Sequence, residues 1–441
     1  MRGPGDPPAK RASRRTSEGR VRRCETSTKR PCDPGSRRTL PILAGSLLLA
    51  ACGGAPGGGL EVVERDSAGV TIVENPLLQE AAAFATVDPT PLLEIGALDG
   101  PAEYQLYIVR DAHRYPDGRL AIATGGSHEV RFYDADGRHL RSTGGEGEGP
   151  GEFRNVVSLW PRPGDSLWAF DSRNRSFTVL DPAGEFVRTH PLGVDASFRI
   201  PQGTFDDGTA LVQTATVFTA GEERTGLQRV PVDVGLYRPD GSLVRSLGEW
   251  PGSEMFVSAE EGRMAVRGLV FGRELFAIAA GDRVVIGSSD VREFRLLRRG
   301  GETERIVRVA GPLDPVATGA FERHVEGILE TSANDDFRRF WRNMFDAMPR
   351  HETYPAYSEI RADAVGRIWV ADYRPPGVER SMWTVFGSDG YMLGRVRTPD
   401  GLRVVEIGED YVLGISRDEL EVERVRLYGL EPAGPGERID G

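Results

Sequence analysis

The sequence predicts an all-β fold: a six-bladed β-propeller of four-stranded antiparallel blades, with a two-helix insertion between blades four and five. Three observations predict it. A turn-and-strand unit recurs six times, a second turn follows it in most copies, and the chain stops one strand short of completing its last unit. The composition is that of a folded chain, because 39% of the 441 residues are hydrophobic and 27% are charged.

The recurring unit is a turn with Gly or Asp followed by a short apolar strand. Its glycines are separated by 46, 44, 73, 85 and 42 residues. A unit of ~40–50 residues that holds four strands is typical of a propeller blade. A second turn, as in FYDADGRHL and VFGSDGYML, is expected between the third and fourth strands of a blade. The six marker glycines are Gly118, Gly164, Gly208, Gly281, Gly366 and Gly408.

The two long spacings indicate insertions. The segment 314–349 carries apolar residues at helical intervals in two successive runs, which predicts two helices packed by one face each. The other excess, at 216–229 and 249–267, is interpreted as long loop. The apolar positions of the two helices are Phe321, Val325, Ile328 and Leu329 in the first, and Phe337, Phe340, Trp341, Met344 and Phe345 in the second.

The ends of the repeat region predict how the ring closes. The stretch LLEIG followed by ALDGPAEYQLY parallels HLRSTG followed by GEGEGPGEF, so residues 91–96 look like the outer strand of a blade. We expect them to pair with the strand at 422–428, which leaves no open edge between the first and last blades. Residues 61–75 are expected to form a preceding hairpin that turns at 67–69.

Five glycines in the ten residues 144–153, GGEGEGPGEF, raise the alternative of a phosphate-binding loop. Such a loop needs a lysine and a following helix, and this stretch has neither, so it is interpreted as the crossover between two blades. It resembles the Gly-rich link of NHL-type repeats. The first blade resembles that repeat well and the others in outline, over residues 90–430. The resemblance implies a bacterial lipid-anchored propeller group that has no settled function.

The first 51 residues are predicted to be an export signal of the lipoprotein type. A long basic region precedes the apolar run 40–51, which is too short to span a bilayer. The run ends in LAAC, which resembles the lipoprotein cleavage box and implies lipidation of Cys52. A plain signal peptide with an incidental cysteine, and a twin-arginine route through 36–40, are the alternatives. Residues 52–60 are expected to be a Gly-rich tether and 61–441 the propeller.

Charge limits the partners. The chain has a formal net charge of −11, and because its first 38 residues hold twelve basic and four acidic side chains, the remainder carries −19. An acidic surface argues against nucleic-acid binding and against docking on anionic lipid. The membrane attachment is therefore expected to come from the lipid anchor, which places the chain in the cell envelope. A protein or carbohydrate partner is expected at a propeller face.

Candidate channel residues follow from counting back from the turns to the inner strands. A calcium site like that of gluconolactonase-like propellers would need converging oxygen ligands, and Asp111, Asn155 and Glu359 are the weak candidates for it. Arginine at the matching depth of blade six favours ion pairs instead of a metal, so no cofactor is expected. The channel or binding candidates are Arg110, Asp111, His113, Glu359, Arg361 and Arg403.

The predicted function is a non-catalytic binding or scaffold module, because the sequence offers no catalytic motif. It has no G-x-S-x-G elbow, and its six histidines lie in no motif spacing. The alternative is a metal-assisted hydrolase of the gluconolactonase-like type. A fold alone does not decide between the two, since propellers carry both activities.

Overall fold

The computed structural model describes residues 62–76, 82–192, 198–215, 225–260, 263–331, 334–378 and 380–434. Contacts divide the chain into two units, 1–58 and 59–441, and the described residues all belong to the second. The predicted signal, the tether and Cys52 lie outside the described residues. No helix of the described part is long and apolar enough to cross a membrane.

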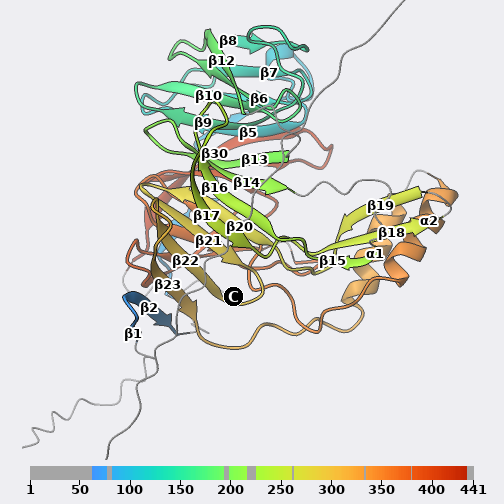
Figure 1. The fold of residues 1–441 in the computed structure, drawn as a ribbon. Helices are drawn as coiled ribbons and strands as arrows, with labels where there is room; N and C mark the ends of the chain where they lie inside the picture. Colours follow the sequence, from blue (N-terminus) through green and yellow to red (C-terminus); the bar gives the residue numbers. More distant parts are fainter. Residues whose placement is uncertain are drawn as a thin grey trace, which may run out of the picture. The chain divides into compact units, whose positions relative to one another are not determined.

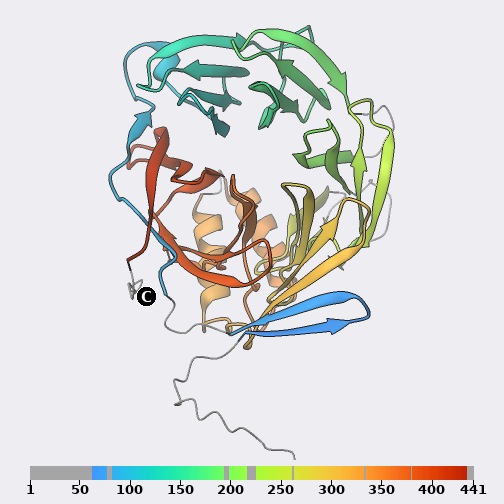
Figure 2. The ribbon, with the colours of Figure 1, turned by 90° about the vertical axis from the view of Figure 1, so that its left-hand side faces the viewer.

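Strands dominate the second unit and form a succession of four-stranded antiparallel sheets, which is the organisation of a β-propeller. Figure 2 shows these sheets following one another around a common centre. The first sheet is β5 (Val109–Arg114), β6 (Leu120–Thr124), β7 (Glu129–Tyr133) and β8 (His139–Gly144), and the second is β9 (Val156–Arg162), β10 (Ser166–Asp171), β11 (Ser176–Leu180) and β12 (Phe186–Pro191). The third is β13 (Phe198–Thr204), β14 (Ala210–Ala215), β16 (Val232–Tyr237) and β17 (Leu243–Trp250).

The next three sheets complete the succession, and two of them take up strands from the N-terminal segment. The fourth sheet is β20 (Leu275–Ala280), β21 (Arg283–Ser288), β22 (Glu293–Arg298) and β23 (Thr303–Val309), extended by β2 (Val70–Asn75) and β1 (Val63–Ser67). The fifth is β24 (Glu359–Ala362), β25 (Ile368–Ala371), β26 (Ser381–Phe386) and β27 (Met392–Thr398). The sixth is β28 (Arg403–Ile407), β29 (Tyr411–Arg417) and β30 (Glu423–Pro432), on which both β3 (Ala85–Val87) and β4 (Leu93–Ile95) pair.

The apolar core is divided among the interfaces between successive sheets. One hydrophobic cluster lies between the first and second sheets, one between the second and third, and so on through the fifth and sixth. A further cluster joins the sixth sheet to the first, with Val405 and Leu413 packed against Val109 and Ile122. Each sheet therefore buries both of its faces, and the last sheet packs on the first.

The predicted pairing of 91–96 with the last strand is confirmed. Ile95 lies opposite Val425 and Leu93 opposite Leu427 in an antiparallel register. Gly96 has φ +137°, and a Cβ there would lie 2.5 Å from the carbonyl oxygen of Glu423. Gly144, at the end of β8, has φ +131° and the same 2.5 Å approach to a neighbouring carbonyl. The two strands thus end in the same way, as the sequence parallel predicts.

The Gly-rich stretch after β8 links the first sheet to the second, as predicted. Gly145 has φ +130°, and the amide of Phe153 donates to its carbonyl oxygen over 2.8 Å. Phe153 itself is fully buried between the two sheets. Glycine is needed here because the backbone turns with a positive φ, a conformation that residues with a side chain rarely adopt.

The insertion is larger than predicted. Helices α1 (Ala320–Glu330) and α2 (Asp335–Asp346) fall inside 314–349 between β23 and β24, which confirms that expectation. The loop interpretation is wrong for 226–228 and for most of 249–267, because β15 (Gly226–Gln228), β18 (Met255–Glu260) and β19 (Arg263–Gly268) form a three-stranded sheet. Residues 216–224, which the same interpretation covered, lie outside the described residues. These strands were missed because each is short and is not preceded by the turn that marks the repeat, so the sequence pattern did not distinguish them from a loop. Figure 1 shows this sheet and both helices projecting together.

The projecting part has a core of its own. Phe256 and Phe271 from the sheet region pack against Phe321, Met344 and Phe345 of the helices. The side chain of Asn334 accepts from the amide of Phe337, and Phe337 is 54% exposed, so the first turn of α2 presents an aromatic residue to solvent. The helical face predicted at 337–345 is thus buried only in part.

Candidate functional site

The first strand of each propeller sheet lies on the inner side of the ring (Figure 2). Three of these first strands, β5, β24 and β28, carry all six predicted channel residues. Two β-bulges shape this region, one in β5 between Val109 and Asp111 and one in β28 between Val404 and Glu406. A bulge adds one residue to one strand and re-aims the side chains that follow. Asp111 and Glu406 each follow a bulge, and the charges of Glu406 and Arg361 both act on the Asp111 carboxylate.

Asp111 is half-buried, and His113 of the same strand is buried, at 7% exposed. The Asp111 carboxylate accepts from the amide of Leu159 over 2.8 Å and from that of Ala112 over 2.9 Å. Burial raises the pKa of Asp111 to about 6, while the Leu159 amide and the Arg361 charge oppose the rise. It therefore carries a proton more readily than an ordinary aspartate.

Arg361 and Arg403 are each hydrogen-bonded to the backbone of the neighbouring sheet. Arg403 donates to the carbonyls of Val109 (2.8 Å) and Arg110 (3.0 Å), which ties the sixth sheet to the first. Arg361 donates to the carbonyl of Val405 over 2.8 Å, which ties the fifth sheet to the sixth. Burial lowers the pKa of Arg403, but the guanidinium stays charged at neutral pH.

His113 lies in a contact that the sequence did not indicate. Its Nδ1 lies 2.5 Å from Oε2 of Glu406, across the boundary between the first and sixth sheets. The hydroxyl of Tyr411 donates to the other oxygen of Glu406, and burial raises the pKa of that hydroxyl. Glu406 was missed because the bulge in β28 changes which side of the strand it faces, and a bulge leaves no clear mark in a single sequence.

The three weak calcium candidates each have other partners. Glu359 pairs with Arg361 over 2.6 Å, on its own strand. Asn155 donates to the hydroxyl of Ser172 over 2.7 Å, and Asp111 accepts from two amides. The structure gives no contact that joins the three, and the described residues hold no group of three or more His, Cys, Asp or Glu side chains placed to bind a metal. Arg110, the remaining channel candidate, is exposed.

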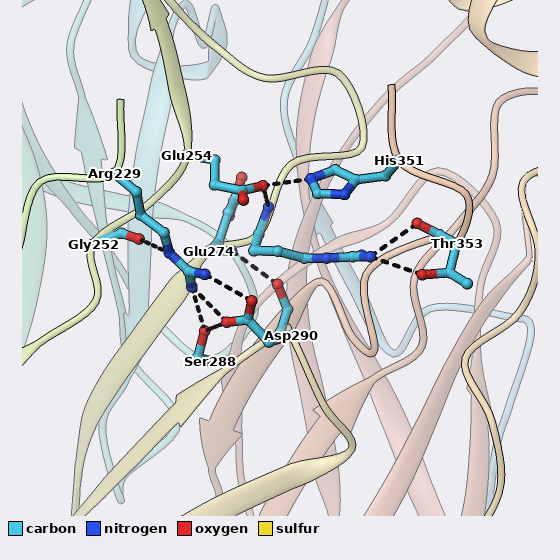
Figure 3. Close-up of polar contacts among 10 residues, drawn as sticks. Arg229, Gly252, Glu254, Glu274, Ser288, Asp290, His351 and Thr353 are labelled. Carbon is cyan, nitrogen blue, oxygen red and sulfur yellow. Dashed lines mark hydrogen bonds and ion pairs between the residues drawn. The ribbon is translucent and has the colours of Figure 1, made fainter. Parts of the chain in front are cut away.

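A second polar cluster lies where the projecting part joins the fourth sheet (Figure 3). Arg229 pairs with Asp290 over 2.5 Å and donates to Ser288 over 2.9 Å. Glu254 accepts from the amide of Arg273 and lies 2.7 Å from Nε2 of His351.

The backbone segments on both sides of the insertion are held by this cluster. Arg273 donates to the hydroxyl of Thr353 over 2.8 Å, beyond the second helix. Glu254 and Arg273 are both more than nine-tenths buried, so the contacts between them are shielded from water. The cluster therefore fixes the projecting part on the fourth sheet, and no motif in the sequence marks it.

Comparison with known proteins gives similarity of structure alone. No protein-family model matches the chain, and no curated protein matches it. A protein of Bacteroides fragilis described as exported has a TM-score of 0.45 at 9% identity, covering 82% of this chain and all of that one. The calcium-binding protein regucalcin of Agrobacterium tumefaciens has a TM-score of 0.35 at 12% identity, covering 82% of this chain and 97% of that one.

A gluconolactonase of Xanthomonas campestris has a TM-score of 0.36 at 10% identity, covering 75% of this chain and 87% of that one. At such identities these similarities say nothing of what this chain binds or catalyses. The class of protein is therefore defined by the strand order and the sheet interfaces: a β-propeller with a projecting α/β part.

Proposed function

We propose that the chain is an exported, lipid-anchored six-bladed propeller that serves as a non-catalytic binding or scaffold module at the cell envelope. The six-blade count is supported by the six sheet interfaces, the last of which joins the sixth sheet to the first. The partner is a protein or a carbohydrate that docks on a propeller face. The anchor is the lipid on Cys52, preceded by a signal of 51 residues.

The observation that carries the proposal is how the inner-strand polar groups are used. Arg403 and Arg361 donate to carbonyls of the next sheet, and His113 contacts Glu406 across a sheet boundary. Groups that are engaged in this way stabilise the ring, because removing one partner leaves a buried polar group without its hydrogen bond. This use favours a structural channel over a ligand cage.

The anchor is tested with the full chain in a bacterial host that processes lipoproteins. We expect wild type to fractionate with membranes and to label with palmitate, and Cys52→Ser to lose both. Cys32→Ser is the matched control, because Cys32 lies in the predicted signal and should leave labelling unchanged. A Cys52→Ser protein that still labels and still sediments with membranes would contradict the anchor.

One observation favours the hydrolase alternative. A half-buried carboxyl group whose pKa is raised to about 6 suits general acid–base chemistry, and Asp111 is such a group. Calcium separates the two functions, since a ligand that binds only the folded state raises its melting temperature. We expect no calcium-dependent rise in wild type. A rise of several degrees that Asp111→Ala abolishes would favour the hydrolase.

Asp111 also has a pH signature that does not depend on either function. Because its folded pKa is raised from 3.8 to about 6, its contribution to stability is fully present below about pH 3.8 and is lost as the pH rises through about 6. The difference in unfolding free energy between wild type and Asp111→Ala should therefore shift against wild type between about pH 4 and pH 6. A difference that is constant over this range would show that Asp111 titrates normally.

A further inference from the structure

A cavity of about 80 Å³ lies between the fourth and fifth sheets, away from the inner-strand channel residues. Its walls are largely apolar and aromatic. The rings of Phe294 and Phe386 meet there edge to face, with their centroids 5.2 Å apart. Tyr357, Val370 and Met392 complete the apolar part of the lining.

Two arginines face this apolar space. Arg292 precedes β22, and Arg395 lies in β27 of the neighbouring sheet. Their side chains are only 18% and 23% exposed. Burial, and then the positive charge of Arg292, lowers the pKa of Arg395, so the two guanidinium groups are close enough to repel each other. A small anion between them would relieve this repulsion.

The donors of both arginines are only partly used. Arg292 donates through Nη2 to Asp314 over 3.1 Å, and Arg395 donates through Nη2 to Asp372. The Nε–H of each is buried and has no hydrogen-bond partner among the described residues. Several other arginines also leave a buried N–H unpaired, so this feature alone does not mark a site. Here it coincides with a cavity and with a second arginine.

Two acidic side chains line the same cavity, and both are already engaged. Asp372 pairs with Arg395. Glu293 is held by Arg308 over 2.6 Å and by Arg295 over 3.3 Å. A guanidinium has five N–H donors, so an anion that takes the Nε–H does not have to displace the carboxylate at Nη2.

We propose that this cavity binds a small organic carboxylate with a compact apolar body. Two single N–H donors from two arginines suit the two oxygens of one carboxylate, and the aromatic walls take the apolar part. At ~10–15 Å³ of such space per water-sized group, the cavity holds about five to eight non-hydrogen atoms. The site does not depend on a partner at the propeller face, so either proposal can fail without the other.

Isovalerate, with a branched body of this size, is the test ligand, and isovaleramide is its neutral counterpart. We expect calorimetry on the purified full-length protein to show isovalerate binding at least 10-fold tighter than isovaleramide, acetate or inorganic phosphate. Acetate and phosphate both keep a negative charge but lack the apolar body. Equal affinity for isovaleramide, or for phosphate, would overturn the proposal, as would the absence of measurable isovalerate binding.

Variants locate the binding. Arg395→Gln and Arg292→Gln should each weaken isovalerate at least 10-fold, and Thr384→Leu should block it by filling the cavity while keeping both charges. Arg298→Gln is the matched control, because that arginine is 69% exposed on the same sheet and does not line the cavity. Circular dichroism confirms folding of each variant. If Arg395→Gln fails to fold, Arg292→Gln and Thr384→Leu decide, and unchanged affinity in either one overturns the site.

Discussion

The N-terminal segment adds strands to two sheets in different ways. β4 pairs antiparallel with β30 and supplies a strand that the last repeat lacks. β2 pairs in parallel with β23 and extends a fourth sheet that already has four strands. Both bury apolar side chains, with Ile95 1% and Val73 0% exposed. The two strands are buried to a similar degree, but β4 completes the sixth sheet and so closes the ring, whereas β2 widens the fourth sheet.

Truncation should produce the largest difference between the two regions. A chain that begins at residue 82 loses only β1 and β2, and we expect it to unfold cooperatively at a melting temperature several degrees lower. A chain that begins at residue 98 also loses β3 and β4, so the cluster between the sixth and first sheets opens to water, and we expect no cooperative transition. Thermal unfolding followed by circular dichroism measures both.

A permuted chain is the control for this comparison. The amide of Ala433 donates to the carbonyl of Phe84, so residue 434 and residue 82 lie near enough for a short linker to join them. Moving 82–97 behind 434 should restore the cooperative transition of the chain that begins at 98. Equal melting temperatures for the two truncated chains would show that β4 does not close the ring.

The contrast also marks what the sequence could predict. The closure of the ring was predictable because the last repeat lacks one strand, and because LLEIG resembles HLRSTG and ends in the same glycine. The pairing of β2 with β23 was not, since nothing in a complete four-stranded unit calls for a fifth strand. The repeat register predicted that Asp111, Arg361 and Arg403 lie on the first strands of their sheets, where the structure has them. It did not predict the contact of Glu406 with His113, because a bulge changes the side of the strand that Glu406 faces.

The glycine that ends β4 should matter as much as its counterpart in a complete sheet. Gly96→Ala and Gly144→Ala each place a Cβ 2.5 Å from a backbone carbonyl at φ above +130°. We expect each to lower the free energy of unfolding by about 3 kcal/mol, since both strain and a backbone displacement are involved. Gly100→Ala is the control for steric contact, because a Cβ at Gly100 would meet no atom within 4 Å, although its φ of +114° adds some strain. A cost for Gly96→Ala much below that of Gly144→Ala would mean that β4 is held loosely.

Asn75 tests whether β2 does more than widen the fourth sheet. It is 1% exposed, donates to the carbonyls of Arg308 (3.2 Å) and Gly390 (3.0 Å), and accepts from the amide of Met392 over 2.8 Å. Because Met392 begins β27 of the fifth sheet and Gly390 lies in the turn before it, the side chain bridges two sheets. Asn75→Ala should lower the unfolding free energy by about 2 kcal/mol, measured by urea denaturation.

Val63→Ala is the control for Asn75→Ala, because Val63 lies in β1 and is 52% exposed, and it should change stability by less than about 0.5 kcal/mol. If Asn75→Ala costs no more than Val63→Ala, the hairpin β1–β2 is an accessory of one sheet and not a link between two.

The smallest effects on stability are expected from the exposed ion pairs of β4 and β2. Glu94 of β4 pairs with Arg424 (2.8 Å) and Arg426 (2.7 Å), and Glu74 of β2 pairs with Arg65 (2.5 Å) and Arg308 (3.6 Å). Both carboxylates are more than a third exposed, at 34% and 38%, and solvent-exposed pairs contribute about 0–1 kcal/mol. Glu94→Gln and Glu74→Gln should therefore each cost about 0.5 kcal/mol at low salt and less at 0.5 M salt, because counterions screen exposed charges. A cost of 2 kcal/mol or more for Glu94→Gln alone, unchanged by salt, would mean that charge and not strand pairing closes the ring, and the equivalence of β4 with β8 would then fail.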